Sequence, residues 1–491
     1  MAEDGTGLEL KDAAPASERA RCPVMPPRPG SLQGQASLLQ LMRIGLRSAI
    51  GIHTEHSYED TRIGRSVVRT LPKGRKRSLF TVRTPDMVRE VLVRRAEEFP
   101  KSQLMDDMLR ALTGYSIFTS NGEDWRRHRR LMDPAFEGAR IAGAFPMMSA
   151  AVDACIARLG EHADRRGARP MAVDTEMTHL AADIIFRTIY SEPMGPKEAR
   201  RFFSAFNVFQ EIAYAHGMLQ IIRFPTWLLP GHYRAKIAAV RIREILHKPL
   251  RRRLRKARAG ETVPSNDILS SMMTTVDPVT GTKFDDAELL NQISMLFLAG
   301  HETSATAMAW ALYLLALDPE VQERVHAEAV RVYGDGEPTF HHMKRLALTR
   351  DVFREAMRLY PPVAVVARDA TRTEKLNKHR VFTPGSIVFV PPWLMHRHTA
   401  HWDNPHAFDP DRFSTPNGQE ALRCAYFPFS MGPRVCAGAA FALQEGTLLL
   451  SQAVRQFRFR LVEGHTPDPV ARLTLRSANG IPLIVERRAA A

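Results

Sequence analysis

Residues 429–438 read FSMGPRVCAG, in which a single cysteine, Cys436, lies between glycines. An apolar helical pattern follows, from about Ala439 to Phe457. Glycines let a backbone approach a flat ring closely, and amide groups at the start of a helix lower the pKa of a thiol. A thiolate on haem iron favours cleavage of the O–O bond. The stretch therefore predicts a haem–thiolate site with Cys436 as the iron ligand.

A long apolar helix is expected upstream of this loop. Asp285 and Asp286 are N-cap candidates and Pro319 is a stop signal, which gives about 33 residues and ~50 Å of helix. Within it, residues 299–303 read AGHET and place an acid, Glu302, beside an alcohol, Thr303. A hydroxyl that does not satisfy its helix carbonyl can relay protons that a carboxylate replenishes. We expect Gly300 to leave room beside the iron for dioxygen.

Phe429, Gly432, Arg434, Cys436 and Gly438 resemble, in full, the haem-binding signature of the cytochrome P450 family. The AGHET segment resembles the oxygen-activation motif of the same family, and the resemblance covers roughly residues 26–488, with only the helical organisation matching between 140 and 280. It implies a mainly α, triangular single domain with small β-sheets, in which a long central helix lies over haem b. Thr303 and Glu302 would be its catalytic residues.

The resemblance also implies which side chains hold the haem propionates. Trp125 and Arg129 in WRRHRR, together with Arg368 and Arg434, match the family's propionate-binding positions. Guanidinium groups suit this task because they bind carboxylates bidentately. His128, within the same run, is expected to be exposed and is left out of the site.

A further motif is assigned a structural role. Glu355 and Arg358, three residues apart in FREAMRLYPP, share a helix face and can form an ion pair. By resemblance they meet Arg412 of the segment FDPDRF. We expect the three side chains to hold the loop that carries Cys436.

The reaction implied by the resemblance is R–H + O₂ + two electrons + two protons giving R–OH and water. Electrons would come from NAD(P)H through a separate ferredoxin and ferredoxin reductase, or a flavodoxin-type donor. A peroxide-using or hydroperoxide-rearranging enzyme, and a haem–thiolate sensor or carrier, are the alternatives, and the Glu302–Thr303 pair argues against both. Apolar residues expected in the pocket favour a fatty acid, terpenoid or steroid substrate: Leu296, Ala299, Val363, Val365 and Val366.

Composition bounds the compartment and the partners. The net charge of +15, from 68 Lys and Arg against 53 Asp and Glu, is compatible with an acidic protein partner. The sequence contains no zinc-finger or RNA-binding signature, so a nucleic-acid partner is not expected. Four unpaired-looking cysteines and the lack of a signal-peptide pattern favour a monomeric cytoplasmic protein. His301 and Glu302 argue that residues 293–317 form a buried helix and not a membrane anchor.

The remaining organisation follows from local signals. Residues 1–30 are expected to be a flexible tail, 31–491 the catalytic domain, and 38–52 an amphipathic helix. A β-hairpin is predicted from SVVRTL and RSLFTVR, and a hairpin turn at Asn479–Gly480. Residues 224–233, FPTWLLPGHY, interrupt two helices and carry Trp227, Leu228 and Leu229 as an entrance lid or a packed turn.

Overall fold

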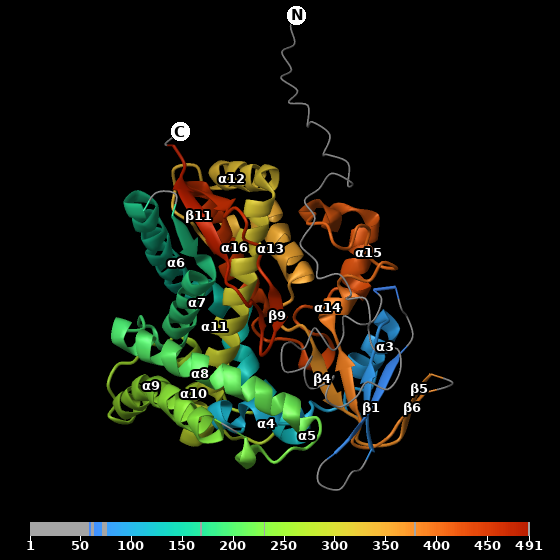
Figure 1. The fold of residues 1–491 in the computed structure, drawn as a ribbon. Coiled ribbons are helices and arrows are strands. Elements are labelled where there is room, and N and C mark those ends of the chain that lie inside the picture. The colour runs from blue at the N-terminus through green and yellow to red at the C-terminus, as the bar shows by residue number, and fades with distance from the viewer. Residues whose placement is uncertain are drawn as a thin grey trace, which may run out of the picture.

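The structure is a computed structural model that describes residues 58–59, 63–70, 76–166, 169–229, 231–377 and 380–489. The predicted tail over residues 1–30 and the amphipathic helix over 38–52 lie outside the described residues. Helices fill most of the molecule, and small sheets lie mainly at its edges (Figure 1). This arrangement confirms the predicted fold class.

Most of the described residues between Pro85 and Thr274 are helical. The α-helices of this region are α3 (Pro85–Arg89), α4 (Gln103–Thr113), α5 (Gly122–Met132), α6 (Gly138–Arg166), α7 (Val173–Tyr190), α8 (Pro196–Gln220), α9 (His232–Arg258) and α10 (Ile268–Thr274). The shorter turns are η1 (Glu90–Arg94), η2 (Asp133–Phe136) and η3 (Thr226–Leu228). Thr84 caps α3 by accepting a hydrogen bond from the Met87 amide.

The second half contains the helices that build the site. They are α11 (Asp286–Leu317), α12 (Pro319–Tyr333), α13 (Ala347–Leu359), α14 (Pro392–Met395), α15 (Pro416–Cys424) and α16 (Ala439–Gln456). The connecting turns are η4 (His342–Arg345), η5 (Pro410–Ser414) and η6 (Gly432–Arg434). The expected helix after Cys436 is therefore confirmed.

The long central helix α11 begins where its sequence predicted. Asp285 accepts the Glu288 amide while the Glu288 side chain accepts the Asp285 amide, which satisfies two otherwise unpaired donors. Most of its 32 residues are buried because α7, α13 and α16 pack around it. A helix that is apolar on all faces belongs in the core of a large protein, and residues 293–317 are buried in this way.

The strands form four small sheets. They are β1 (Gly64–Arg69), β2 (Lys76–Thr81), β3 (Pro170–Ala172), β4 (Val366–Asp369), β5 (Glu374–Asn377), β6 (Arg380–Phe382), β7 (Ile387–Val390), β8 (Phe457–Leu461), β9 (Pro469–Ala471), β10 (Leu475–Ser477) and β11 (Pro482–Arg487). The strand orders are β1-β2-β7-β4, β10-β9, β3-β11-β8 and β5-β6. The predicted antiparallel pairing of β1 with β2 is confirmed, with Gly64 opposite Thr81.

The hairpin predicted at Asn479–Gly480 is wrong. The two residues form a turn, but the strands on either side of it belong to different sheets, because β10 pairs with β9 while β11 pairs with β3 and β8. The turn itself was predicted correctly, because Gly480 adopts φ +77°, a backbone conformation that favours glycine. Strand pairing is a tertiary choice that the dipeptide does not determine.

Candidate functional site

The loop before α16 presents Cys436. Its backbone amide donates to the Phe429 carbonyl at 2.9 Å, which closes the loop around the intervening residues. Gly432 adopts φ +74°, and a Cβ there would lie 2.2 Å from the Leu92 carbonyl oxygen of η1. Only glycine fits this close approach, so one glycine of the motif serves the folding of the loop itself.

The thiol of Cys436 is accessible although protein atoms surround it. Desolvation raises its pKa above the ordinary value, against the opposing effects of the Gly438 amide and the Arg129 charge. The amide at the helix start thus acts in the expected direction, but in the chain alone desolvation outweighs it. A coordinating metal ion deprotonates a thiol outright, so iron itself is the group able to supply the thiolate.

Three cations gather beside this loop: Arg368, which is buried, and Lys101 and Arg434, which are half-buried. Arg434 lies over the Trp125 ring, 5.2 Å from its centroid, and Lys101 forms a β-bridge with Arg368. Burial, Arg434 and Arg368 lower the pKa of Lys101 to about 6, and burial with Arg434 lowers that of Arg368 to about 9. Among the described residues, none of the three has a carboxylate within ion-pair distance.

These cations fit the two propionates of haem b. The Nε atoms of Arg368 and Arg434 are buried without a hydrogen-bond partner within the described part of the chain. Buried N–H groups are normally paired. Arg434 lowers the pKa of both Lys101 and Arg368, and like charges held together in this way favour an anionic partner. Trp125, Arg368 and Arg434 are thus brought together as expected, and Lys101 joins them.

Lys101 was missed by sequence reasoning. It follows Pro100 in a polar segment, and nothing local distinguishes it from a surface lysine. Its proximity to Arg368 depends on an isolated bridge between segments far apart in the chain.

Arg129 is placed elsewhere. Its Nη1 donates to the Val435 carbonyl at 2.6 Å, and its Nε pairs with Asp133 at 2.6 Å. The side chain therefore braces the residue before Cys436 from α5. Its role at a propionate stays a prediction.

His128, expected to be exposed, is buried with 2% of its surface exposed, so that expectation is wrong. Its Nδ1 lies 3.1 Å from the Ser120 hydroxyl, and its Nε2 lies 3.7 Å from Glu288 of α11. Burial lowers its pKa. It fastens α5 to the central helix and stays outside the cation group.

Glu302 is held in place by the C-terminal strand pair. Its carboxylate accepts from Arg476 Nε at 2.6 Å and from the Thr474 hydroxyl at 2.7 Å, and Arg476 Nη2 bonds its second oxygen. Burial raises the pKa of Glu302, but Arg476, His301 and these hydrogen bonds outweigh burial and lower it. At neutral pH Glu302 is therefore an ionised acceptor with no proton to give.

One expectation about the same helical turn is wrong. The Thr303 hydroxyl donates to the Ala299 carbonyl at 2.6 Å, so it satisfies its helix carbonyl in this structure. A Cβ on Gly300 would lie 2.9 Å from Ile185 Cγ1, so the glycine admits helix α7. Room for dioxygen beside Gly300 stays a prediction.

A protonated carboxyl lies behind this turn. Glu445 of α16 is 2% exposed, and its Oε1 has no hydrogen-bond partner within the described residues. Burial raises its pKa to about 8, opposed by a hydrogen bond with Ser304, the neighbour of Thr303. At neutral pH, Glu445 and not Glu302 is the neutral acid beside the oxygen-activation motif.

Glu355, Arg358 and Arg412 form the predicted cluster. Arg358 binds Glu355 through two hydrogen bonds of 2.7 and 2.8 Å, and Arg412 adds one of 2.9 Å. Arg358 also donates to the His396 and Pro405 carbonyls at 2.8 and 2.7 Å.

The cluster reaches the cysteine loop through His396. The ring Nε2 of His396 accepts the Phe427 amide at 3.0 Å, two residues before the motif begins. Burial, followed by Arg358 and Arg397, lowers the pKa of His396 to about 3, so the ring stays a neutral acceptor. Sequence reasoning missed His396 because its partners, Arg358 and Phe427, come from two distant segments.

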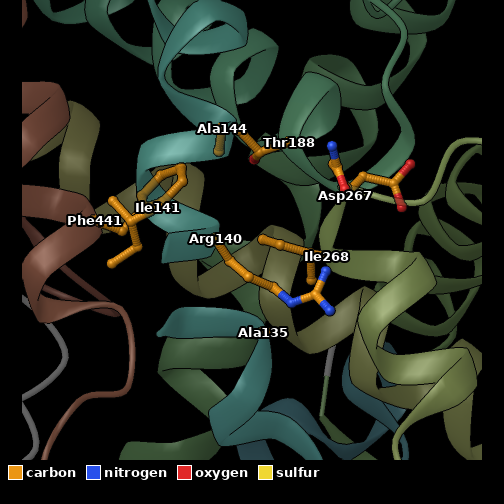
Figure 2. A pocket seen from close by; sticks show the side chains of 9 residues that line it. Ala135, Arg140, Ile141, Ala144, Thr188, Asp267, Ile268 and Phe441 are labelled. Carbon is orange, nitrogen blue, oxygen red and sulfur yellow. The ribbon is translucent and has the colours of Figure 1, made fainter. Parts of the chain in front are cut away.

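One small pocket lies away from this site. Figure 2 shows it at the start of α6 and α16, with Ile141 and Phe441 opposite Asp267. Its volume of about 10 Å³ admits a single water. It is too small for an organic substrate.

The pocket residues expected from the sequence divide between core and site. Leu296 is 6% exposed and packs into the core formed by α7, α8 and α11. Ala299, Val363, Val365 and Val366 are half-buried. These four keep apolar surface available beside α11 and β4.

Comparison with known proteins identifies the family. The cytochrome P450 family model matches residues 70–483. The chain is 31% identical over 404 residues to cyclooctatin synthase of Streptomyces melanosporofaciens, covering 82% of this chain and 85% of the relative. It is 30% identical over 382 residues to cyclooctat-9-en-7-ol 5-monooxygenase of the same organism, covering 78% and 80%.

A solved structure is also similar. The haem domain of cytochrome P450DA superposes with a TM-score of 0.74 at 25% identity, covering 87% of this chain and 90% of that one. The chain belongs to the cytochrome P450 family and is a cytochrome P450 monooxygenase, an enzyme class that uses haem and O₂.

Among the described residues, one helix, Gly138–Arg165, is long and apolar enough to cross a membrane by length and composition alone. In the structure, 44% of its most apolar window is buried. Core helices of globular proteins pass the same test.

Proposed function

We propose that this cytochrome P450 inserts one oxygen atom of O₂ into a hydrophobic, terpenoid-type substrate, with haem b ligated by Cys436. The observation that carries the proposal is the cation group beside the cysteine loop. Arg368 is buried and Lys101 and Arg434 are half-buried, and within the described part of the chain none of them has a carboxylate at ion-pair distance. They lie next to a thiol that protein atoms surround. A dianionic macrocycle with a metal that takes thiolate satisfies both features.

When bound, haem b supplies an iron centre that activates dioxygen. Cys436 would hold the iron, and Trp125, Lys101, Arg368 and Arg434 would hold the propionates. Arg129 would brace the loop from the Val435 carbonyl.

Thr303 and Glu302 are the proposed catalytic residues. To pass a proton, the Thr303 hydroxyl must leave the Ala299 carbonyl, because a hydroxyl has one proton to donate. Glu302 accepts hydrogen bonds while Arg476 keeps it ionised. For Glu302 to resupply the proton that Thr303 passes on, the Arg476–Glu302 ion pair must first open. Otherwise the proton must come from a neutral acid.

The terpenoid class is supported by the two Streptomyces relatives and by the half-buried apolar residues near α11. Fatty acids and steroids share this apolar chemistry and are the comparison substrates. Electrons would come from NAD(P)H through a ferredoxin and its reductase, or from a flavodoxin-type donor. The enzyme would work as a cytoplasmic monomer without nucleic acid, and residues 31–491 would form its catalytic domain.

The reduced protein with carbon monoxide is the first test. Thiolate ligation predicts an absorption band near ~450 nm that Cys436→His abolishes. A thiolate-type band that persisted in this variant would assign the ligand to another residue.

Turnover separates the proposal from its alternatives. Incubation with dioxygen, NAD(P)H and a ferredoxin–reductase pair should convert a cyclic terpenoid alcohol into a hydroxylated product. Product formed only with peroxide would support a peroxide-using enzyme. A stable carbon monoxide complex without turnover under either condition would support a sensor or carrier.

A further inference from the structure

Helix α5 meets the cysteine loop at two points that lie one helical turn apart. At the first point the Arg434 guanidinium lies over the Trp125 ring, 5.2 Å from its centroid. At the second, Arg129 donates from Nη1 to the Val435 carbonyl at 2.6 Å. Side chains four residues apart on a helix share one face, so both contacts come from the same side of α5. The second contact reaches the peptide group directly before the proposed iron ligand.

Hydrogen bonds hold both ends of this peptide group. Its carbonyl, from Val435, accepts from Arg129. Its amide, from Cys436, donates to the Phe429 carbonyl at 2.9 Å. A peptide group is planar and its plane includes the next Cα atom, so two hydrogen bonds at opposite ends fix the orientation of the Cys436 Cα. Arg129 therefore helps to set the direction in which the Cys436 side chain leaves the loop.

Arg129 also brings positive charge to the loop, and Asp133 limits that charge. The Nε atom of Arg129 pairs with the Asp133 carboxylate at 2.6 Å, one turn further along the chain. The Arg129 side chain is 20% exposed and that of Asp133 is 46% exposed, so solvent screens the carboxylate more than the guanidinium. Burial raises the pKa of the Cys436 thiol, and the Gly438 amide and the Arg129 charge oppose that rise. The positive charge of Arg129 thus acts on the sulfur despite its ion pair.

The partners of Arg129 differ from those of the cation group assigned to the propionates. Among the described residues, no carboxylate lies within ion-pair distance of Lys101, Arg368 or Arg434. Arg129 already has one, from Asp133, and a carbonyl acceptor besides. At Arg129 the chain itself supplies the anion that a propionate would supply to the other three cations.

We propose that Arg129 is a positioning residue for Cys436 and not a propionate ligand, and that the Arg129–Asp133 pair sets the reduction potential of the bound haem. The proposal rests on the proposed function, in which Cys436 is the iron ligand. One-electron reduction of ferric to ferrous iron adds one negative charge to the iron–thiolate unit. A cation near the sulfur stabilises that added charge, and a carboxylate that neutralises the cation weakens the effect.

The test is the reduction potential of the full-length holoenzyme, measured by spectroelectrochemical titration. Arg129→Gln removes the cation and should lower the equilibrium constant for reduction ~10-fold, which corresponds to ~59 mV for one electron. Asp133→Asn removes the carboxylate but leaves the Val435 contact in place. It should raise the constant ~3-fold, a smaller change because Asp133 is the more exposed member of the pair. The double variant should lie between the two single variants.

Matched controls lie on the same helix. Arg126 and Glu123 form an ion pair on α5 whose side chains are 43% and 63% exposed. Arg126→Gln and Glu123→Gln therefore remove the same charges, and each should change the equilibrium constant less than ~2-fold because solvent and salt screen exposed charges. Arg129→Lys keeps the charge and should stay within ~2-fold of the parent. A role in packing alone would make Arg129→Lys as defective as Arg129→Gln.

The carbon monoxide band separates failure of this proposal from failure of the proposed function. A parent without a band near ~450 nm would overturn both, because Cys436 would not be the ligand. With the band present, potentials of Arg129→Gln and Asp133→Asn that shift in opposite directions support the proposal. Unchanged potentials, or shifts in the same direction, would overturn it.

Haem retention distinguishes the two roles of Arg129. If Arg129→Gln retains no haem, a raised potential in Asp133→Asn still supports the proposal. Haem loss from Arg129→Gln as rapid as from Arg368→Ala, with an unchanged potential in Asp133→Asn, would overturn it and assign Arg129 to a propionate.

Discussion

Two groups of arginines in this protein differ in what completes them. Arg358 and Arg412 share Glu355 and several backbone carbonyls, all contributed by the chain itself. Arg368 is buried and Arg434 is half-buried, yet each retains a buried Nε without a partner in the described structure. The first group is complete within the protein, and the second requires an anion from outside.

The difference explains which residues support the fold and which bind the prosthetic group. A buried ion group gains stability only when every donor and acceptor is paired. Burial raises the pKa of Glu355, but its two arginines and the Asp409 amide outweigh burial and lower it. In the second group, burial and like charge act in the same direction on Lys101 and Arg368, and their pKa values fall.

The largest effect is expected in the complete group. Glu355→Ala leaves two arginines buried without their carboxylate, which costs ~3 to 5 kcal/mol of folding free energy. Haem-free or misfolded protein should result, as measured by the haem-to-protein ratio and thermal unfolding. Asp411→Ala is the matched control, because the partly exposed Arg324–Asp411 pair nearby should contribute only ~0 to 1 kcal/mol. A stable, fully loaded Glu355→Ala enzyme would contradict the structural role.

An intermediate case is the ion pair between Arg476 and Glu302. Arg476→Ala should cost ~3 kcal/mol, the lower end of the range for buried pairs, because Arg476 is 32% exposed. The folded pKa of Glu302 is lowered, so its stabilisation is present above its unfolded pKa and is lost as the pH falls.

Urea unfolding of this variant and its parent at neutral and acidic pH measures that dependence. The stability difference should be largest at neutral pH and should shrink below the ordinary Glu pKa of ~4.3. A difference that stayed constant with pH would show that Arg476 acts through packing. Arg460→Ala, at an exposed pair with Glu486, is the control.

A smaller effect on the fold is expected in the incomplete group. Arg368→Ala should leave the apoprotein folded and weaken haem retention by ~1.5 to 3 kcal/mol, the value of one charge-assisted hydrogen bond. Transfer of haem to an acceptor protein measures this loss. Misfolding as severe as that of Glu355→Ala would remove the distinction between the two groups.

The smallest effect concerns the pH dependence of haem binding. In the chain alone the pKa of Lys101 is about 6, and a neighbouring propionate would raise it. Haem binding should therefore take up a proton above pH ~6, and affinity should fall as the pH rises, by at most about tenfold per unit. Haem titration of the apoprotein across this range should show the slope, and Lys101→Met should abolish it. The same slope in the variant would point to another group.

Local signals in the sequence predicted a large part of the molecule. The capping residues of α11, the hairpin of β1 and β2, the helix after Cys436 and the Glu355–Arg358 pair all depend on neighbours within a few residues. The cysteine motif determined the family for the same reason, because its loop is built from consecutive residues. Spacing along one helix or turn is a property of the chain before it folds.

Only the tertiary structure decided the contacts between distant segments. Glu302 meets Arg476 from the C-terminal strands, Gly300 meets Ile185 of α7, and Lys101 meets Arg368. The first contact keeps Glu302 ionised, the second requires a glycine at position 300, and the third contributes to the lowered pKa of Lys101. Burial and partner choice set these states, and both depend on which surfaces the folded chain brings together.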